Sequence, residues 1–116
     1  MKSSGGIVVV GGMNMDIQGR SSRPFRPGDS NPGTATRSPG GVGRNIAENL
    51  VRLGRSVELV TVLGTDSLSD ELAKSCADRG IGLSGSIRLP GSSSSTYITI
   101  FDHDGSLVGA IAAMEG

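Results

Sequence analysis

The chain has 116 residues, and its 11 Lys and Arg are balanced by 11 Asp and Glu. This balance gives no electrostatic basis for binding nucleic acid or an anionic membrane surface. No apolar run is long enough to span a bilayer, so a membrane protein is excluded. The single cysteine, Cys76, excludes an internal disulfide framework and is typical of a reducing compartment. No secretory signal follows Met1, so we expect a cytoplasmic location.

Short apolar segments closed by glycines predict alternating strands and helices. Residues 7–10 (Ile-Val-Val-Val) are β-branched and end at Gly11, which predicts a strand buried on both faces. Residues 42–53 have helical spacing, with Ile46, Leu50 and Leu53 on one face and Gly54 as the C-terminal stop. This gives a strand, a long excursion and then a helix.

The second half repeats the alternation. Residues 56–63 predict a buried strand, and a helix follows in which Ser67 and Asp70 have the spacing of a capping box. Leu72 and Cys76 lie on the apolar face of that helix, and residues 87–89 predict a short strand. Strands that alternate with helices favour an α/β fold with a parallel sheet.

Two segments interrupt this alternation. Residues 17–39 are polar and proline-rich, and they form an insertion between the first strand and the first helix. Residues 95–112 alternate in side-chain character around Asp104-Gly105, which predicts a β-hairpin. Residues 92–95 are all serine and predict a flexible hinge. Because the chain stops just after the hairpin, we expect it to be the N-terminal portion of a longer fold.

Asn14 and Asp16 follow the first strand at the edge where open α/β sheets bind ligands. A carboxylate accepts two hydrogen bonds at once, which suits a vicinal diol, and an amide two residues away adds a donor on the same side of an extended backbone. The pair therefore suits a sugar. The same two residue types also form turns and caps, and that alternative stays open.

Residues 40–45 (Gly-Gly-Val-Gly-Arg-Asn) open the first helix. Gly40 and Gly41 would let a ligand approach the backbone, and N–H groups of the first turn would face the same space as Asn45. A loose loop before the helix is the alternative. A dinucleotide fingerprint does not fit, because the glycines do not lie directly between a strand and a helix, and a P-loop lysine is absent from the sequence.

Other polar residues have simpler explanations. Arg44 is expected to be a surface cation, His103 an exposed turn residue, and Asp66 a cap for the second helix. No Cys and His cluster predicts a metal site.

Three motifs in this order resemble the N-terminal part of the ribokinase-like (PfkB) family of carbohydrate and nucleoside kinases. They are Gly11 with residues 14–16 (Asn-Met-Asp), residues 39–54 around Gly-Gly-Val-Gly-Arg-Asn-Ile-Ala-Glu-Asn-Leu, and residues 62–66 (Val-Leu-Gly-Thr-Asp). Residues 29–33 (Asp-Ser-Asn-Pro-Gly) are similar to the pattern of pseudouridine kinases within that family. Val42 stands where ribokinases usually carry Lys, which argues against free ribose.

The resemblance implies a mostly parallel sheet flanked by helices, with a small β lid formed by residues 17–39 and 95–112, and residues 1–116 would be the N-terminal part of a single domain. It implies transfer of the γ-phosphoryl group of ATP, with Mg²⁺, to the 5′-hydroxyl of a ribosyl substrate, and a homodimer formed through the lid. Asn14 and Asp16 would hold ribose hydroxyls, and Gly41, Val42 and Asn45 would complete the sugar site. The lid residues Ser30, Asn31 and Tyr97 would meet the base.

One family element has no counterpart in this sequence, namely the Gly-Ala-Gly-Asp helix start that supplies the catalytic aspartate and the anion hole. The ATP pocket also belongs to that missing part. We therefore expect residues 1–116 to be inactive alone, because phosphoryl transfer needs donor, acceptor and charge stabilisers together. The alternatives are a kinase for ribose, adenosine or a ketohexose phosphate, and a non-catalytic module that binds a ribosyl ligand or pairs through its lid.

Overall fold

The computed structural model describes residues 6–113. The elements in chain order are β1 (Ile7–Val10), β2 (Asn14–Ser21), β3 (Gly33–Gly40), α1 (Val42–Arg52), β4 (Val57–Val60), β5 (Val62–Leu63), α2 (Ser67–Asp78), β6 (Ile81–Gly82), β7 (Ile87–Arg88), β8 (Thr96–Phe101) and β9 (Leu107–Ala113). The helices and strands alternate as an α/β fold requires, and the described helices are too short or too polar to cross a membrane.

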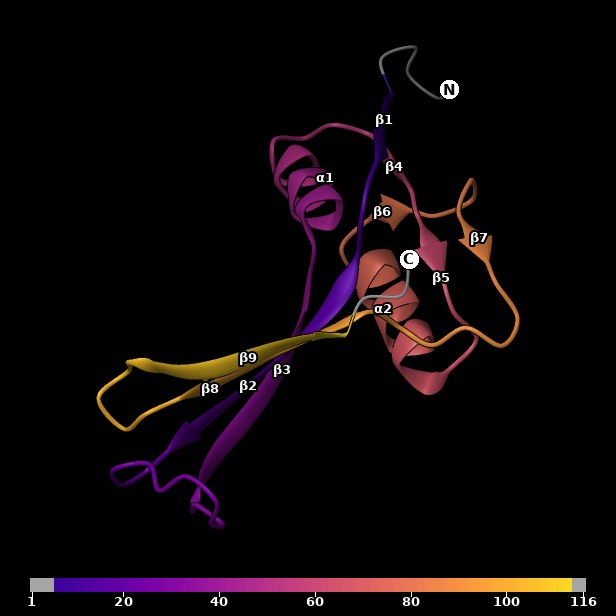
Figure 1. Ribbon diagram of the computed structural model, residues 1–116. Coiled ribbons are helices and arrows are strands. Elements are labelled where there is room, and N and C mark those ends of the chain that lie inside the picture. The colour runs from indigo at the N-terminus through magenta and orange to yellow at the C-terminus, as the bar shows by residue number, and fades with distance from the viewer. Residues whose placement is uncertain (1–5, 114–116) are drawn as a thin grey trace.

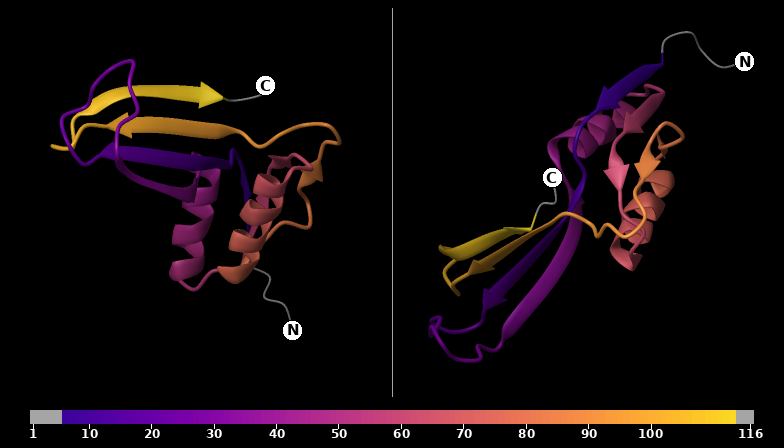
Figure 2. Two further views of the ribbon diagram at one scale, coloured as in Figure 1. Left: turned by 90° about the horizontal axis from the view of Figure 1, so that it is seen from below. Right: turned by 45° about the vertical axis from the view of Figure 1, so that its right-hand side comes forward.

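A parallel three-stranded sheet in the order β1-β4-β6 forms the body of the molecule. The two helices lie side by side against it (Figure 2), and the Arg79 guanidinium of the α2 C-terminus reaches Glu48 of α1 at 3.5 Å. The apolar side chains between these layers form the core: Met13, Met15, Ala47, Val57, Leu59, Leu63, Leu72, Cys76 and Ile81. Cys76 is fully buried with its Sγ 3.5 Å from the Met13 Sδ, so its predicted core position is confirmed.

A second, four-stranded sheet in the order β3-β2-β8-β9 extends away from the body (Figure 1), and we call it the projecting sheet. β2 runs antiparallel to β3 and parallel to β8, and β8 runs antiparallel to β9. The segments predicted as separate insertions therefore pair with each other. The hairpin at residues 95–112 is confirmed by the antiparallel pairing of β8 with β9, and its turn contains Gly105 with a positive φ of 89°.

The predicted strand at residues 56–63 is wrong in one respect, because it is two strands in different sheets. β4 pairs with β1 and β6, and after Thr61 the chain turns so that β5 pairs with β7. The Thr61 N–H donates to the Ser86 Oγ at 3.0 Å, and the Thr61 carbonyl accepts from Ile87 N–H at 3.0 Å. An uninterrupted apolar run carries no signal of such a break. The two-residue strand β6 was also not predicted.

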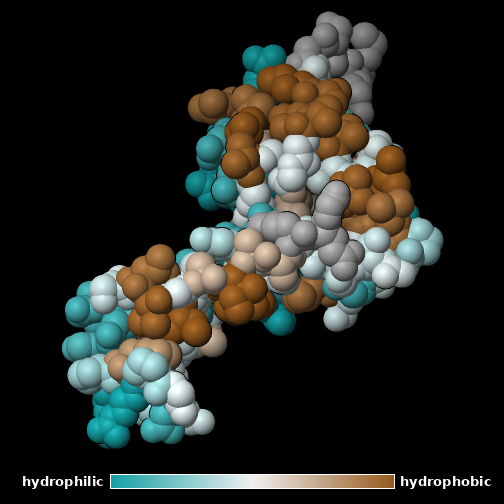
Figure 3. Space-filling view, viewed as in Figure 1, coloured by the Kyte–Doolittle hydropathy of each residue, from teal (hydrophilic) through white to brown (hydrophobic). Residues whose placement is uncertain are grey.

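The predicted burial of β1 on both faces is corrected by the structure. Only one face of β1 packs against the helices, and Val8 and Val10 are 63% and 78% exposed. In α1 the buried positions are Gly43, Arg44 and Ala47, while Ile46 and Leu53 lie largely exposed. Figure 3 shows the resulting apolar surface at the β1–α1 end of the molecule. A helical apolar stripe shows which face is apolar, but it does not show what covers that face.

Candidate functional site

Asn14 and Asp16 form a connected pair at the start of β2, where the body meets the projecting sheet. The Asn14 Nδ2 donates to the Asp16 Oδ1 at 2.6 Å, so amide and carboxylate lie on the same face of the strand. Met15 between them points to the opposite face and is fully buried. Asn14 is 9% exposed and Asp16 is half-buried. The core contact of Met15 thus fixes the direction of the two polar side chains on either side of it.

Gly40 leaves space for the Asp16 carboxylate. It ends β3 and lies opposite Asn14 in the antiparallel register. A Cβ on Gly40 would lie 2.3 Å from the Asp16 Oδ2 and 3.0 Å from its Oδ1. A side chain at position 40 would therefore displace the carboxylate. The sequence suggested that the space at Gly40 admits a ligand. In the structure the side chain of Asp16 occupies this space, and Asp16 is the residue expected to bind that ligand.

The glycines that open α1 pack against the link between β1 and β2. Gly41 has a φ of +100°, and a Cβ there would lie 2.6 Å from the Gly12 carbonyl oxygen. A Cβ on Gly43 would lie 2.8 Å from the Gly11 Cα. The Arg44 N–H also donates to the Gly12 carbonyl at 3.2 Å. Residues 11–12 and 41–43 thus form an interlock that holds the start of α1 next to Asn14.

The remaining predicted sugar-site residues lie in the first turn of this helix. Val42 is 76% exposed and Asn45 is exposed. The Asn45 Oδ1 accepts a hydrogen bond from the Arg44 Nη1 at 3.1 Å. Because α1 begins two residues after Gly40, these side chains belong to the same junction as Asn14 and Asp16. The structure thus brings Asn14, Asp16 and Gly41 together at this junction, and Val42 and Asn45 lie in the helical turn that follows it.

Arg44 is not the surface cation that the sequence suggested. Its side chain is 7% exposed and its Nη1 lies 2.5 Å from the Glu48 Oε1. Arg52 and Arg79 contact the same carboxylate, so one acidic residue holds three guanidinium groups. The spacing of four residues between Arg44 and Glu48 was a readable signal of an ion pair along the helix. The pair stabilises α1, and the same Arg44 Nη1 also donates to the Asn45 side chain.

Asp66 caps α2 and also ties down the serine run. Its Oδ1 accepts from the Ser69 N–H at 3.1 Å, so Asp66 is the N-cap and the capping box expected at Ser67 is wrong. The Ser94 N–H and Oγ donate to the same carboxylate, each at 2.9 Å. Hydrogen bonds from Ser69 and then Ser94 hold the pKa of the Asp66 carboxyl well below its usual range. Residues 92–95 are thus anchored before β8, not the free hinge expected.

The lid residues predicted to meet a base fall into two groups. Tyr97 lies in register with Asp16 on the neighbouring parallel strand and is 38% exposed, so the structure brings it to the site. Ser30 and Asn31 lie in the loop between β2 and β3, and this loop lies at the far end of the projecting sheet (Figure 1). Five residues of extended strand from Asp16 to Ser21 already span roughly 17 Å. The structure does not bring Ser30 and Asn31 together with Asp16.

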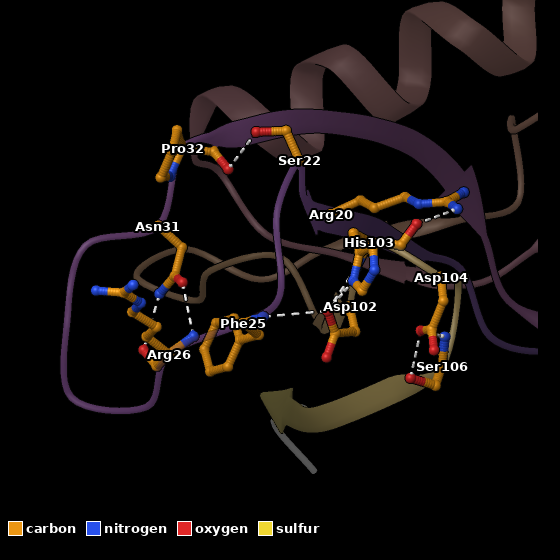
Figure 4. A network of polar contacts seen from close by, with 10 residues as sticks. All are labelled: Arg20, Ser22, Phe25, Arg26, Asn31, Pro32, Asp102, His103, Asp104 and Ser106. Atoms are coloured by element: carbon orange, nitrogen blue, oxygen red, sulfur yellow. Dashed lines mark hydrogen bonds and ion pairs between the residues drawn. The ribbon is translucent and has the colours of Figure 1, made fainter.

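The same far end holds a network that connects two loops. The Asn31 side chain accepts from the Arg26 N–H at 2.8 Å and shapes its own loop. The Asp102 Oδ1 in the β8–β9 turn accepts from the Phe25 N–H at 3.1 Å, which joins the loops (Figure 4). The possible ligand atoms of Asp102, His103 and Asp104 lie within 4.8 Å of one another. His103 occupies the predicted turn. Its backbone N–H donates to the Asp102 Oδ1 at 2.7 Å, and its ring Nδ1 lies 2.7 Å from the same oxygen.

The candidate site therefore combines a charged acceptor, an amide and a tyrosine beside a helix start. The oriented carboxylate can accept hydrogen bonds from two hydroxyl groups, and the second N–H of the Asn14 amide can donate to a third oxygen. This arrangement can bind a polyhydroxylated ring. Within residues 6–113 it offers no group placed to activate a phosphoryl donor.

Comparison with known proteins places the chain in a family. The sequence model of the pfkB family of carbohydrate kinases matches residues 5–111. The chain therefore belongs to the pfkB carbohydrate kinase family.

Individual relatives agree with this assignment. The chain is 46% identical over 104 residues to the uncharacterized sugar kinase YeiI of Escherichia coli K12. The aligned segment covers 90% of this chain and 29% of that protein. It is 34% identical over 114 residues to the pseudouridine kinase of the same organism, covering 98% of this chain and 36% of the relative. The chain thus spans about a third of the length of these relatives.

Solved structures show the same fold. A carbohydrate kinase from Agrobacterium tumefaciens superposes with a TM-score of 0.82 at 32% identity, over 92% of this chain and 34% of that one. The Arabidopsis thaliana ribokinase complexed with ribose and ATP superposes with a TM-score of 0.83 at 24% identity, over 95% of this chain and 36% of that one. The expected ribokinase-like fold class, and its N-terminal portion in particular, are confirmed.

Proposed function

We propose that the polypeptide carrying residues 1–116 is an ATP-dependent kinase that phosphorylates the 5′-hydroxyl of a ribosyl acceptor, with pseudouridine as the acceptor. The observation that carries this proposal is the hydrogen-bonded pair of Asn14 and Asp16 at the junction of the two sheets. Membership of the pfkB family and 34% identity to a pseudouridine kinase support it. A related fold has been solved with ribose and ATP.

In this proposal the Asp16 carboxylate accepts hydrogen bonds from two ribose hydroxyls, and Asn14 adds a donor while it orients the carboxylate. Gly41, Val42 and Asn45 border the sugar from the first turn of α1. Tyr97 lies beside Asp16 and contacts the base. Ser30 and Asn31 would reach a base only through the lid of a second copy, which is consistent with the proposed homodimer.

The phosphoryl donor belongs elsewhere in the polypeptide. ATP and Mg²⁺ bind mainly through residues beyond 1–116, because the sequence holds neither a P-loop lysine nor a Gly-Ala-Gly-Asp segment. Residues 1–116 therefore bind and orient the acceptor, and alone they are inactive. The projecting sheet acts as a lid over the acceptor. We further propose a cytoplasmic location and no nucleic-acid or membrane partner, consistent with the balanced charge.

An acceptor panel tests the proposal. The complete polypeptide is assayed for ATP-dependent phosphorylation of pseudouridine, ribose, adenosine and a ketohexose phosphate, and residues 1–116 are assayed in parallel. We expect pseudouridine to give the highest kcat/KM and the shorter chain to give no turnover. Preference for another acceptor would overturn the substrate assignment. Binding of pseudouridine without any phosphorylation by the complete polypeptide would instead favour a non-catalytic ribosyl-binding module.

A further inference from the structure

A buried guanidinium contacts one of the residues proposed to bind the sugar. The Arg44 side chain is 7% exposed, while its neighbour Asn45 is exposed. The Arg44 Nη1 has two partners, because it lies 2.5 Å from the Glu48 Oε1 and donates to the Asn45 Oδ1 at 3.1 Å. A single nitrogen thus connects the ion pair of α1 to the proposed sugar site. The proposed function uses Asn45 and assigns no role to Arg44.

The order of charges in this ion pair is the less favourable one for a helix. Arg44 is the third residue of α1, where a cation meets the positive end of the helix dipole. Ion pairs four residues apart stabilise a helix better when the acidic residue comes first, and here Glu48 comes second. Helix stability alone therefore does not explain a guanidinium at this position, whereas a role toward Asn45 does.

Both ends of the Arg44 side chain are held in place. The Arg44 N–H donates to the Gly12 carbonyl at 3.2 Å, next to the close approach of Gly43 to Gly11. At the other end, the guanidinium is bound by Glu48, whose side chain is only 13% exposed. The interlock thus fixes the backbone of Arg44, and the ion pair fixes its tip. A group that is ordered in this way before a ligand binds can orient its neighbour without a further entropy cost on binding.

The contact with Arg44 determines how the Asn45 amide is turned. A guanidinium has only N–H donors, so the amide atom that faces it must be the oxygen Oδ1. The amide nitrogen Nδ2, with its two N–H donors, then lies on the side away from the guanidinium. An asparagine without this contact can turn its amide over and accept a hydrogen bond where it otherwise donates one. Arg44 therefore makes Asn45 a defined donor.

Resting on the proposed function, we infer that Arg44 is a positioning residue that presents Asn45 to the acceptor as a hydrogen-bond donor. Arg44 itself does not touch the acceptor. The acceptor atom that Asn45 binds is an oxygen with a free lone pair, such as the ring oxygen or a hydroxyl oxygen of the ribosyl group. The site thus offers the Asp16 carboxylate as an acceptor from β2 and the Asn45 amide as a donor from α1.

A double-mutant cycle on the complete polypeptide tests this inference, with the affinity for pseudouridine measured by calorimetry without ATP. Asn45→Ala should weaken binding about three- to tenfold, because one neutral hydrogen bond is lost. Arg44→Met keeps the apolar stem and should weaken binding by a similar or smaller factor, because the ligand must then order the amide. In the Asn45→Ala background, Arg44→Met should have no further effect. Two losses that simply add would overturn the inference, since a merely structural Arg44 acts without Asn45.

Arg52→Met is the matched control, because it removes another guanidinium from the same Glu48 carboxylate. Arg52 is 73% exposed and lies about two helical turns from Asn45. The affinity for pseudouridine should stay unchanged in this variant. A loss as large as that in Arg44→Met would mean that binding follows the stability of α1, which contradicts a positioning role.

Asn45→Asp tests whether Asn45 donates. The aspartate still offers an oxygen to Arg44, but it has no N–H group, so the affinity should fall at least as far as in Asn45→Ala. Retained affinity would show that Asn45 accepts a hydrogen bond and would refute the inference. Because this change alters only an exposed side chain, the test stands even if Arg44→Met does not fold.

Nuclear magnetic resonance of the ligand-free polypeptide gives a readout that does not depend on binding. The Asn45 side-chain amide should be rigid on the picosecond-to-nanosecond timescale in the wild type and in Arg52→Met, and mobile in Arg44→Met. Equal rigidity in all three proteins would show that Arg44 does not orient the amide.

The outcomes separate this inference from the proposed function. If Asn45→Ala weakens pseudouridine binding and Arg44→Met does not, the inference fails and the ribosyl site stands. If Asn45→Ala binds like the wild type, the inference also fails, while Asp16 keeps its proposed role. If the wild-type polypeptide binds no pseudouridine, or if Asp16→Ala binds it as well as the wild type does, the proposed function itself fails.

Discussion

Replacing Gly43 by alanine tests the interlock that positions the candidate site. The added Cβ would lie 2.8 Å from the Gly11 Cα and 3.0 Å from the Gly12 N. These are backbone atoms and cannot rotate away, so α1 must shift from the β1–β2 link. Overpacking of this kind costs about 1–3 kcal/mol, while alanine in a helix gains about 0.8–1 kcal/mol over glycine. We expect Gly43→Ala to lower the free energy of unfolding by up to about 2 kcal/mol.

Gly12→Ala is the matched control within the same contact. A Cβ on Gly12 has no heavy atom within 4 Å, and Gly12 does not have a positive φ. Alanine there should leave the free energy of unfolding unchanged or raise it by about 0.4–1 kcal/mol through the unfolded chain. Urea unfolding of the wild type and both variants measures the difference. A Gly43→Ala variant as stable as Gly12→Ala would refute the close approach of helix and link.

Three further predictions concern single side chains. Gly40→Ala should displace the Asp16 carboxylate and weaken ribosyl binding about tenfold or more, which is on the order of one charge-assisted hydrogen bond. Calorimetry measures this affinity, and an unchanged value would contradict the prediction. Asp66→Ala should lower the free energy of unfolding by about 1–2 kcal/mol at neutral pH. The folded pKa of Asp66 lies below its ordinary value of 3.8. The loss of unfolding free energy in Asp66→Ala should therefore be complete above pH 3.8 and shrink as the pH falls below it. A loss that stays constant in acid unfolding curves would argue against the cap. Asp102→Ala should speed hydrogen exchange of the Phe25 amide, and unaltered exchange would show that the two loops are held by other contacts.

The placement of Asn14 and Asp16 could be predicted because it depends on local rules. Residues two apart in an extended strand share a face, and the buried Met15 between them fixes which face it is. The hairpin turn at residues 104–105 was equally local. In each case the residues that decide the geometry are adjacent in the sequence.

The features that were missed depend on contacts between distant segments. The link at residues 11–12 occupies the space next to Gly41 and Gly43, which no pattern within residues 40–45 reveals. The break at Thr61 arises because β5 pairs with β7 and not with β1. Ser94 binds Asp66 across 28 positions of the chain, so a serine run that resembles a hinge is in fact anchored.

The central claim is that the Asp16 carboxylate binds the ribose diol. The most direct measurement compares the affinity of the complete polypeptide for pseudouridine and for 2′-deoxypseudouridine, in the wild type and in Asp16→Ala. The wild type should prefer the ribonucleoside by roughly 10- to 100-fold, because one hydrogen bond to a charged acceptor is worth about 1.5–3 kcal/mol. In Asp16→Ala that preference should disappear. An equal preference in wild type and variant would show that the diol is bound by other residues.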